Sequence, residues 1–354
     1  MPIGASPVDF GNVNVGERRS AGSVSVIIPT KNRADDLALT IRSLLRQTVL
    51  PDEVVIVDQS PDELSKKAVD NEFAAAALRK TPPVRLRYII DTHISGAADA
   101  RNRAMDIASG EVWVFLDDDV RLEENFLEEM LAAYARHPEV AGVSGIITNY
   151  LPHALIPRLW SWVFVRGPFH DDRQPIYLKA ERLRTADVIP VSRFTGAAMS
   201  FRASSLQNLR FDPRLTGCSL AEDVDLCMRL RPAKLVLAPR ARVAHERSAA
   251  GRPREHWLRA HAQSANYLYA RHLRHDLGAR LALAWMSAGY GLALAAACVR
   301  RGSLEPWRSF INGIQRARTI TANGDPTANG GPTANGDTTS NRDPISNRDP
   351  GTPV

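Results

Sequence analysis

The stretch EVWVFLDDDV, residues 111–120, runs from a short apolar segment directly into three aspartates. Residues 112–116 are apolar and mostly β-branched or aromatic, which is typical of a buried strand. Asp117, Asp118 and Asp119 repel one another and favour water. Such a triplet can bind a divalent cation or sugar hydroxyls through its oxygens, or it can form an acidic turn before the next helix. This stretch alone leaves those uses open.

The sequence before the triplet alternates apolar runs with helical patterns. Continuous apolar strands that alternate with helices are typical of a parallel, doubly wound sheet. In such a sheet, ligands bind at the carboxyl ends of the strands. Asp58 and the aspartate triplet both follow predicted strands and fall at this edge. The predicted strands are 23–30, 53–58, 84–90 and 111–116, and the predicted helices are 33–47, a stretch that ends near residue 78, 97–108 and 122–137.

The pattern becomes less regular after about residue 150. Residues 153–169 form an aromatic segment with prolines. We expect this segment to face an acceptor or a membrane. The elements that we predict further on are a strand over 194–202, a short helix over 220–230, a pair of strands over 234–245 and a basic helix with aromatic residues over 254–273.

Residues 281–299 carry no charge and are flanked by Arg280, Arg300 and Arg301. Nineteen residues are just long enough to span a bilayer, but alanine and glycine dominate and weaken insertion. Two interpretations stay open. The segment is a membrane-inserted or interfacial helix, or it is a helix buried in the core.

The charge balance of the chain indicates an anionic partner. The 354 residues have a formal net charge of +6. A membrane surface or a phosphorylated ligand fits this charge. Nucleic acid is the least supported partner, because the sequence carries no motif for binding it.

Features of the ends and of the cysteines bear on location. Three cysteines without metal-ligand spacing read as reduced thiols. The N-terminal residues show no signal peptide. We expect a cytoplasmic location, peripheral to or anchored in the inner face of the cell membrane. Five hexads over 321–350, such as TANGDP, are poor in large apolar groups and predict a disordered tail.

Seven short motifs occur in a defined order along the chain. In this order, they resemble glycosyltransferase family 2, a large family of inverting GT-A sugar transferases. The resemblance covers about residues 23–250 and implies a GT-A fold, which is a Rossmann-like, mainly parallel sheet flanked by helices. The motifs are IIPTKNR (27–33), VVIVDQS (54–60), GAADARNRA (96–104), FLDDDV (115–120), TGAAMSFR (195–202), AEDVDLCMRL (221–230) and VAH (243–245).

We expect four parts, of which the resemblance covers only the second. A flexible leader over 1–22 precedes a GT-A domain over 23–250, with a nucleotide-sugar half (23–150) and an acceptor half (151–250). A helical, membrane-associated extension follows over 251–318. The hexad tail then takes up 319–354.

On the nucleotide side, the resemblance implies a role for each matching residue. Pro29, Thr30 and Asn32 would line the base and ribose at the end of the first strand. Asp58 would hydrogen-bond the base. Arg101 would lie near the nucleotide and its diphosphate.

The aspartate triplet matches the DXD element of the family. Asp117 and Asp119 would hold the ribose and a divalent metal, manganese or magnesium, and Asp118 would join Asp117 in binding the nucleotide sugar. His245 matches a histidine that completes the metal site in many relatives. A lone histidine after a strand is also common as an ordinary surface or core residue.

The acid pair in AEDVDL matches the position that supplies the catalytic base. The resemblance implies that Asp223 takes the proton from the acceptor hydroxyl and that Glu222 orients or binds the acceptor. Asp225 is expected to pair with Arg229 four residues on or to be solvated. The alternative is an amphipathic helix whose first turn simply favours acids.

The predicted function is metal-dependent transfer of a sugar, with inversion, from a UDP- or dTDP-sugar to an acceptor hydroxyl. A cation would neutralise the charge that develops on the diphosphate leaving group. The expected acceptor is a glycan or lipid-linked glycan in cell-surface polysaccharide synthesis, and an anionic membrane surface is a further expected partner. The alternative is a catalytically inactive GT-A-like scaffold that binds a nucleotide or a partner.

Overall fold

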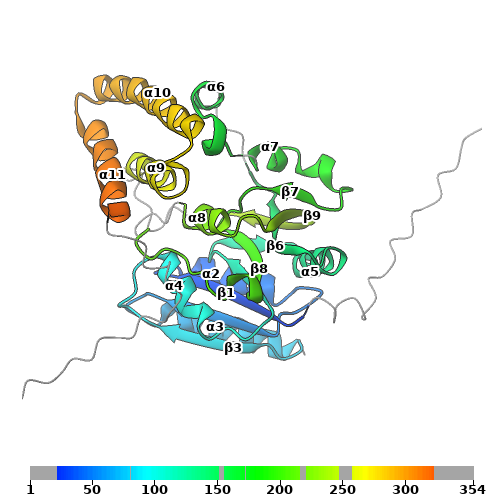
Figure 1. Cartoon of the computed structure of the whole chain (residues 1–354). Helices are drawn as coiled ribbons and strands as arrows, with labels where there is room; N and C mark the ends of the chain where they lie inside the picture. Colours follow the sequence, from blue (N-terminus) through cyan, green and yellow to red (C-terminus); the bar gives the residue numbers. More distant parts are fainter. Residues whose placement is uncertain are drawn as a thin grey trace, which may run out of the picture.

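The computed structural model describes residues 22–79, 81–150, 155–171, 173–215, 221–246 and 257–322. The predicted leader (except residue 22), the tail from residue 323 and Cys218 lie outside these residues. Within them, one central sheet carries helices on its faces, and three helices form a further layer at one end of the molecule (Figure 1).

The first four strands form an all-parallel sheet, as predicted. Its strands lie in the order β3 (Arg85–Ile90), β2 (Glu53–Asp58), β1 (Val24–Thr30) and β4 (Val112–Leu116). Helices α2 (Ala34–Leu44), α3 (Leu64–Leu78) and α4 (Ala97–Met105) connect these strands. All strands therefore end at the same edge, where Asp58 and the triplet lie.

The strands that follow β4 in the chain turn the sheet into a mixed one. β8 (Ala198–Arg202) lies antiparallel to β4, and β6 (Val140–Ile147) lies antiparallel to β8. β9 (Lys234–His245) then runs parallel to β6 and antiparallel to the short strands β5 (Val120–Leu122) and β7 (Ile189–Val191). The α/β class that we predicted is confirmed.

Several elements that follow β4 in the chain differ from the sequence-based expectation. The predicted pair of strands over 234–245 is wrong, because β9 is one continuous strand. β5, β6 and β7 were not predicted. β6 contains Gly142 and Gly145, which weaken an apolar strand pattern, and both sit where a Cβ would overlap neighbouring atoms.

The remaining helices cover the sheet and extend beyond it. α5 (Phe126–Arg136) and α8 (Glu222–Arg229) pack on the sheet core through Phe126 and Leu226, and α6 (Leu155–Phe164) and α7 (Gln174–Tyr177) lie between β6 and β7 in the chain. The C-terminal layer contains α9 (Trp257–Leu268), a π-helical turn (Tyr269–Leu273), α10 (Leu277–Arg301) and α11 (Glu305–Ala322). α11 continues through 319–322, which we had assigned to the tail.

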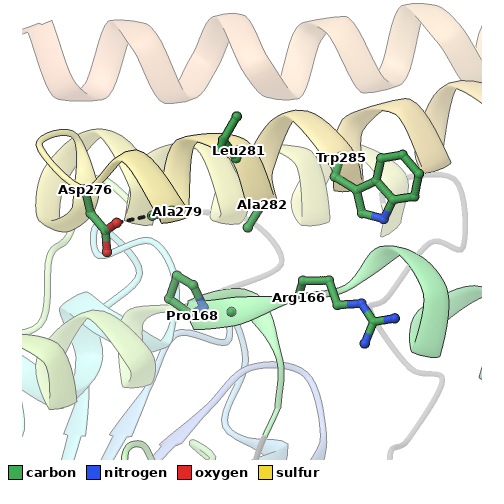
Figure 2. Close-up of a pocket in the computed structure, with 9 residues that line it drawn as sticks. Arg166, Pro168, Asp276, Ala279, Leu281, Ala282 and Trp285 are labelled. Atoms are coloured by element: carbon green, nitrogen blue, oxygen red, sulfur yellow. Dashed lines mark hydrogen bonds between the residues drawn. The ribbon is translucent and has the colours of Figure 1, made fainter.

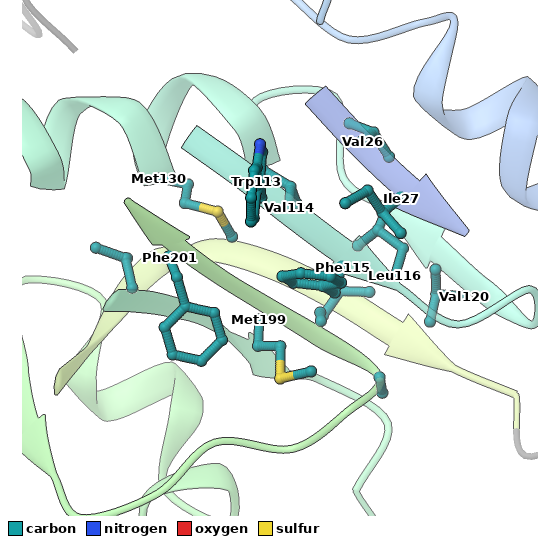
Figure 3. Close-up of a cluster of buried hydrophobic side chains, with 14 of the residues drawn as sticks. Val26, Ile27, Trp113, Val114, Phe115, Leu116, Val120, Met130, Met199 and Phe201 are labelled. Atoms are coloured by element: carbon teal, nitrogen blue, oxygen red, sulfur yellow. The ribbon is translucent and has the colours of Figure 1, made fainter. Parts of the chain in front are cut away.

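The core of the sheet lies directly behind the aspartate triplet. Phe115 is fully buried and meets Phe201 and Phe211 edge to face, with ring centroids 6.2 and 5.3 Å apart (Figure 3). Met199 packs in the same cluster. The apolar segment of β4 therefore anchors the start of the acidic turn.

The C-terminal layer is joined to α8 by a buried polar cluster. The Asp225 carboxylate accepts hydrogen bonds from Arg229 Nε at 2.9 Å, as the sequence predicted, and it lies 2.8 Å from His272 Nε2. The Tyr267 hydroxyl lies 2.6 Å from Asp212 and 3.3 Å from Asp225. Both aspartates are fully buried.

Cations and apolar contacts complete this connection. Arg271 Nη1 donates to Asp212 at 2.6 Å, and Arg214 binds the same carboxylate and the carbonyl of Ile320 in α11. Although burial opposes ionisation, the hydrogen bonds from Arg214 and Tyr267 lower the pKa of Asp212 to about 2. Val224 of α8 packs in an apolar cluster with residues of the C-terminal layer. The extension is therefore fixed to the helix that begins with the predicted acid pair.

We predict that Asp225→Ala lowers the free energy of unfolding by about 3–5 kcal/mol, because it leaves buried cations without their counter-charge. The measurement is urea unfolding followed by circular dichroism. The matched control is Asp70→Ala, which removes an exposed ion pair with Lys66 (2.6 Å) and should cost about 0.5 kcal/mol. Equal effects of the two changes would contradict a structural role for the cluster.

Candidate active site

The acidic turn after β4 is held in place by backbone and side-chain hydrogen bonds. The Asp117 amide donates to the carbonyl of Ala197 at 3.1 Å. The buried Thr40 hydroxyl of α2 lies 2.7 Å from the Asp118 carbonyl and 2.8 Å from the Val120 carbonyl. These contacts fix the direction of the three carboxylates relative to the sheet edge.

Asp117, Asp119 and His245 converge on one point. Their ligand atoms all lie within 4.8 Å of one another. His245 Nε2 is 3.1 Å from Asp119 Oδ1 and 3.7 Å from Asp117 Oδ2. The β5–β9 ladder produces this geometry, because Val120 pairs with His245 and brings the histidine beside the triplet. The three predicted metal ligands are therefore neighbours, although 126 residues separate the last two.

The donor atoms of this group fit a divalent cation. Among the described residues, His245 Nε2 is buried and makes no hydrogen bond, even though two carboxylate groups lie within 4 Å of it. Two carboxylates and one imidazole suit manganese or other first-row cations, and the carboxylates also suit magnesium. A buried imidazole nitrogen that faces carboxylate oxygens without bonding them is in a suitable position to bind a cation directly.

Asp118 points away from this group towards the end of β1. It accepts hydrogen bonds from Thr30 Oγ1 at 2.8 Å and Arg33 Nη1 at 2.9 Å, and Arg33 also lies 3.4 Å from Asp119. Burial raises the pKa of Asp118 to about 6, against the opposing effect of Arg33. Arg33 thus offsets part of the repulsion within the triplet, a role that its place in the IIPTKNR motif did not reveal.

The residues predicted to bind the base and ribose lie along the ends of β1 and β2. Asp58 is fully buried and accepts hydrogen bonds from the Ser60 hydroxyl (2.5 Å) and the Tyr88 hydroxyl (2.7 Å). Pro29 lies opposite Val57 in the β1–β2 ladder. The Asn32 amide donates to Ser60 Oγ, and Asn32 adopts a positive φ of 55°. Ser60 therefore links the ends of the two strands.

Arg101 lies between the triplet and the acid pair. Its buried guanidinium donates to Asp117 Oδ1 and Glu222 Oε1, both at 2.9 Å, and to the Gly196 carbonyl at 3.2 Å. Phe211 contributes a cation–π contact at 5.5 Å. Burial opposes the charged form, but Asp117 and Glu222 raise the pKa of Arg101, which stays a cation. The side chain that we expected near the diphosphate thus has its terminal nitrogens bonded to the protein.

Gly196 connects Arg101 to the predicted base. Its amide donates to Asp223 Oδ2 at 2.8 Å, and its carbonyl accepts from Arg101. A Cβ at this position would lie 3.1 Å from Arg101 Nη2, so a larger residue would force the guanidinium to shift by a few tenths of an ångström. The second oxygen of Asp223 accepts from the Val224 amide at 2.8 Å. Two backbone amides therefore orient the Asp223 carboxylate.

Glu222 is buried beside Asp223 at the start of α8. Its Oε2 has no hydrogen-bond partner among the described residues. Burial and the charge of Asp223 raise the pKa of Glu222, and Arg101 opposes this shift. Ala221, which precedes the pair, adopts a left-handed φ of 84°, so the turn into α8 is strained.

The fold is that of the GT-A glycosyltransferases. A solved structure that resembles this chain is the mannosyltransferase PcManGT from Pyrobaculum calidifontis in complex with GDP-Man and Mn2+. It has a TM-score of 0.51 and 19% sequence identity, and the match covers 86% of this chain and 88% of that one. This likeness concerns the fold.

Residues 25–206, just over half of the chain, match the model of Glycosyl transferase family 2. The chain belongs to that family. The match ends before α8 and β9, so the acid pair and His245 lie beyond it.

Curated relatives with glycosyltransferase names match parts of the chain. Validoxylamine A glucosyltransferase from Streptomyces hygroscopicus subsp. limoneus is 27% identical over 58% of this chain and 47% of its own length. Pre-mycofactocin glycosyltransferase from Mycobacterium tuberculosis is 29% identical over 78% of this chain and 55% of its own length. The UDP-Glc:alpha-D-GlcNAc-diphosphoundecaprenol beta-1,3-glucosyltransferase WfgD from Escherichia coli is 30% identical over 36% and 45%, respectively. This chain spans about half the length of the curated relatives that it matches.

The buried state of Glu222 leads to a pH prediction. The pKa of Glu222 is higher in the folded than in the unfolded protein, so the folded state keeps a proton that the unfolded state loses above its ordinary pKa of 4.5. This contribution to stability is present at low pH and is lost as the pH rises from about 5 to about 8. Glu222→Gln is permanently neutral, so its free energy of unfolding should fall less across this range.

The measurement is urea unfolding at several pH values without added metal. The exposed Glu63→Gln serves as the control and should follow the wild type. Parallel profiles for the wild type and Glu222→Gln would contradict the raised pKa.

Proposed function

We propose that this protein transfers a sugar from a nucleoside diphosphate sugar to an acceptor hydroxyl, with inversion at the anomeric carbon. The observation that carries this proposal is a single buried cation, Arg101, that hydrogen-bonds both Asp117 and Glu222 at 2.9 Å. It joins a group suited to binding a metal–diphosphate to a pair of acids suited to activating a hydroxyl. Membership of a glycosyltransferase family supports the same reaction class.

The donor would bind along the edge formed by β1, β2 and β4. Pro29, Thr30 and Asn32, at the end of β1, would line the base and ribose. Asp58, at the end of β2, accepts hydrogen bonds from Ser60 and Tyr88. Asp58 is fully buried, so we infer that it affects base binding indirectly, by holding the ends of these strands in position. Asp118, held by Thr30 and Arg33, would border the donor site at the end of β1.

Asp117, Asp119 and His245 would hold the divalent cation, manganese or magnesium. When bound, such a cation supplies positive charge that stabilises the diphosphate leaving group. The carboxylates of Asp117 and Asp119 would offset the charge of the cation, and His245, placed by the β5–β9 ladder, would offer an imidazole nitrogen as a third ligand. Arg101 holds Asp117 in place from behind, so we assign it a positioning role.

Asp223 would act as the base. Inversion requires a proton acceptor on the face of the sugar opposite the leaving group, which is the need that inverting hydrolases also meet with a carboxylate. Asp223 lies at the start of α8, across Arg101 from the metal ligands, and two backbone amides orient it. Glu222, with its unpartnered Oε2, would contact the acceptor from the same helix turn.

The names of the relatives support a donor and acceptor class. WfgD is named for UDP-Glc and for an acceptor linked to diphosphoundecaprenol. We propose a UDP- or dTDP-sugar as the donor and a glycan or lipid-linked glycan of cell-surface polysaccharide synthesis as the acceptor. A cytoplasmic protein at the inner face of the membrane would meet both.

We predict that binding of a nucleoside diphosphate depends on the acidic group. Calorimetric titration with UDP, dTDP and GDP, with and without Mn2+, should show binding to one of them that requires the metal. Asp119→Asn should weaken this binding at least about tenfold, because it removes a charged ligand. Asp106→Asn, an exposed change, is the control. Absence of binding by all three nucleotides would refute the transferase proposal.

We predict that Asp223→Asn lowers kcat by about 10²–10⁴-fold while nucleotide binding stays within a few-fold of the wild type, because a general base acts in the chemical step. The assay measures release of the nucleoside diphosphate with an acceptor mixture, and NMR of the product gives the anomeric configuration. Retention of configuration would exclude single displacement. A protein that binds the nucleotide but releases none in any acceptor mixture would fit the alternative of an inactive scaffold.

A further inference from the structure

Helix α10 exposes a continuous apolar stripe. Leu281, Trp285, Leu292 and Val299 recur at helical spacing and have exposed fractions of 63%, 51%, 66% and 84%. α10 is long and apolar enough to cross a membrane, yet only 22% of its most apolar stretch is buried inside the protein. A stripe of large apolar side chains of this length is uncommon on a protein surface in contact only with water.

The opposite face of α10 is packed against the protein. Met286, Tyr290 and Leu294 are buried in a cluster with Phe310 of α11. The Trp160 indole donates to the Gly289 carbonyl at 3.1 Å. A helix that crosses a bilayer would lose these contacts. The protein therefore covers one face of α10 and leaves the other face exposed.

Helix α6 continues the same apolar surface. None of its residues is buried among the described parts of the chain, and Leu155, Leu159 and Trp162 lie on one exposed face, at spacings of four and three residues. Trp285 joins the two helices, because its ring lies 5.4 Å from that of Phe164 and its Nε1 donates to the Val163 carbonyl at 3.0 Å. The two segments are far apart in sequence but adjacent in space (Figure 1).

A hollow of about 450 Å³ lies between α10 and the segment that follows α6 (Figure 2). Its lining is mainly apolar, from Pro168 to Leu281 and Trp285. Two charged residues also line it: Arg166 stands at its edge, and Asp276 accepts a hydrogen bond from the Ala279 amide at the start of α10. Apolar walls beside a guanidinium suit an amphiphile that has an anionic head and a hydrocarbon chain.

The charge of this layer points to an anionic occupant. Residues 257–322 contain nine arginines and two acidic residues. Arg280, Arg300 and Arg301 lie on α10 itself, at the two ends of the apolar stripe, and Arg158 and Arg166 lie on or beside α6. Large apolar side chains, exposed tryptophans and flanking arginines are the features of a helix at a bilayer interface.

We propose that the surface formed by α6 and α10 (the α6–α10 surface) rests on an anionic lipid bilayer, with α10 parallel to the membrane plane and not across it. The exposed stripe enters the headgroup and acyl boundary, and the arginines contact lipid phosphates. This resolves the two interpretations of 281–299 in favour of an interfacial helix.

Membrane binding at the α6–α10 surface would also favour a lipid-linked acceptor. This part of the proposal rests on the proposed function. The buried cluster of Asp225, Tyr267 and His272 joins the C-terminal layer to α8, which begins with Glu222 and Asp223. A membrane under α10 would therefore hold the acid pair at a fixed relation to the lipid surface.

The test is flotation of the purified full chain with vesicles of neutral phosphatidylcholine, with or without one-third anionic phosphatidylglycerol, in the absence of donor and acceptor. The wild type should bind the anionic vesicles, and high salt should weaken that binding. Leu281→Asp/Leu292→Asp should lower the partition coefficient at least about tenfold. Leu64→Asp/Leu78→Asp is the matched control, because it makes the same change at leucines 61% and 86% exposed on α3.

The control adds the same negative charge, so a loss confined to the α10 variant reports the apolar stripe. Equal losses in both variants, or no vesicle binding by the wild type, would overturn the proposal. Resistance of the bound protein to extraction at alkaline pH would instead indicate a spanning helix and would also overturn it. The proposal would also be overturned if sedimentation showed a dimer in the absence of lipid and only the α10 variant disrupted that dimer. Metal-dependent nucleotide binding is measured without vesicles, so failure here leaves the proposed reaction intact.

Discussion

The buried guanidinium of Arg101 is the interaction on which the arrangement of the site depends. It is a cation without access to water, and it stays charged because Asp117 and Glu222 flank it at 2.9 Å. Removing a partner of such a pair leaves an uncompensated charge that costs about 3–5 kcal/mol. The positions of the triplet and of α8 are therefore coupled. Gly196, which admits the guanidinium and orients Asp223, belongs to the same unit.

The second constraint is the repulsion among three carboxylates at the end of one strand. The fold separates them by function. Asp118 turns to Thr30 and Arg33, whereas Asp117 and Asp119 turn to His245. The remaining negative charge faces a point where a cation fits. An acidic turn that served only as a helix start would not need a buried histidine nitrogen directed at it.

The C-terminal layer adds a third level of organisation. It lies outside the matched family region, yet it makes buried ionic contacts with α8 and carries an apolar surface on its far side. Asp225 is only two residues from the proposed base, and its partners Tyr267 and His272 come from this layer. The extension thus supports α8 and is not a loosely attached appendage.

The sequence by itself determined the parallel half of the sheet and the acids at its edge, because β1 to β4 are short apolar runs whose burial is local and whose carboxyl ends must meet. It also offered pairing with Arg229 as one of two expectations for Asp225, since residues four apart share a helix face, and the structure shows this ion pair. Only the tertiary structure brought His245 beside Asp119, turned Arg101 inward and placed α10 with one face packed and one exposed. These features depend on strand pairing and helix packing between distant segments, which local periodicity does not encode.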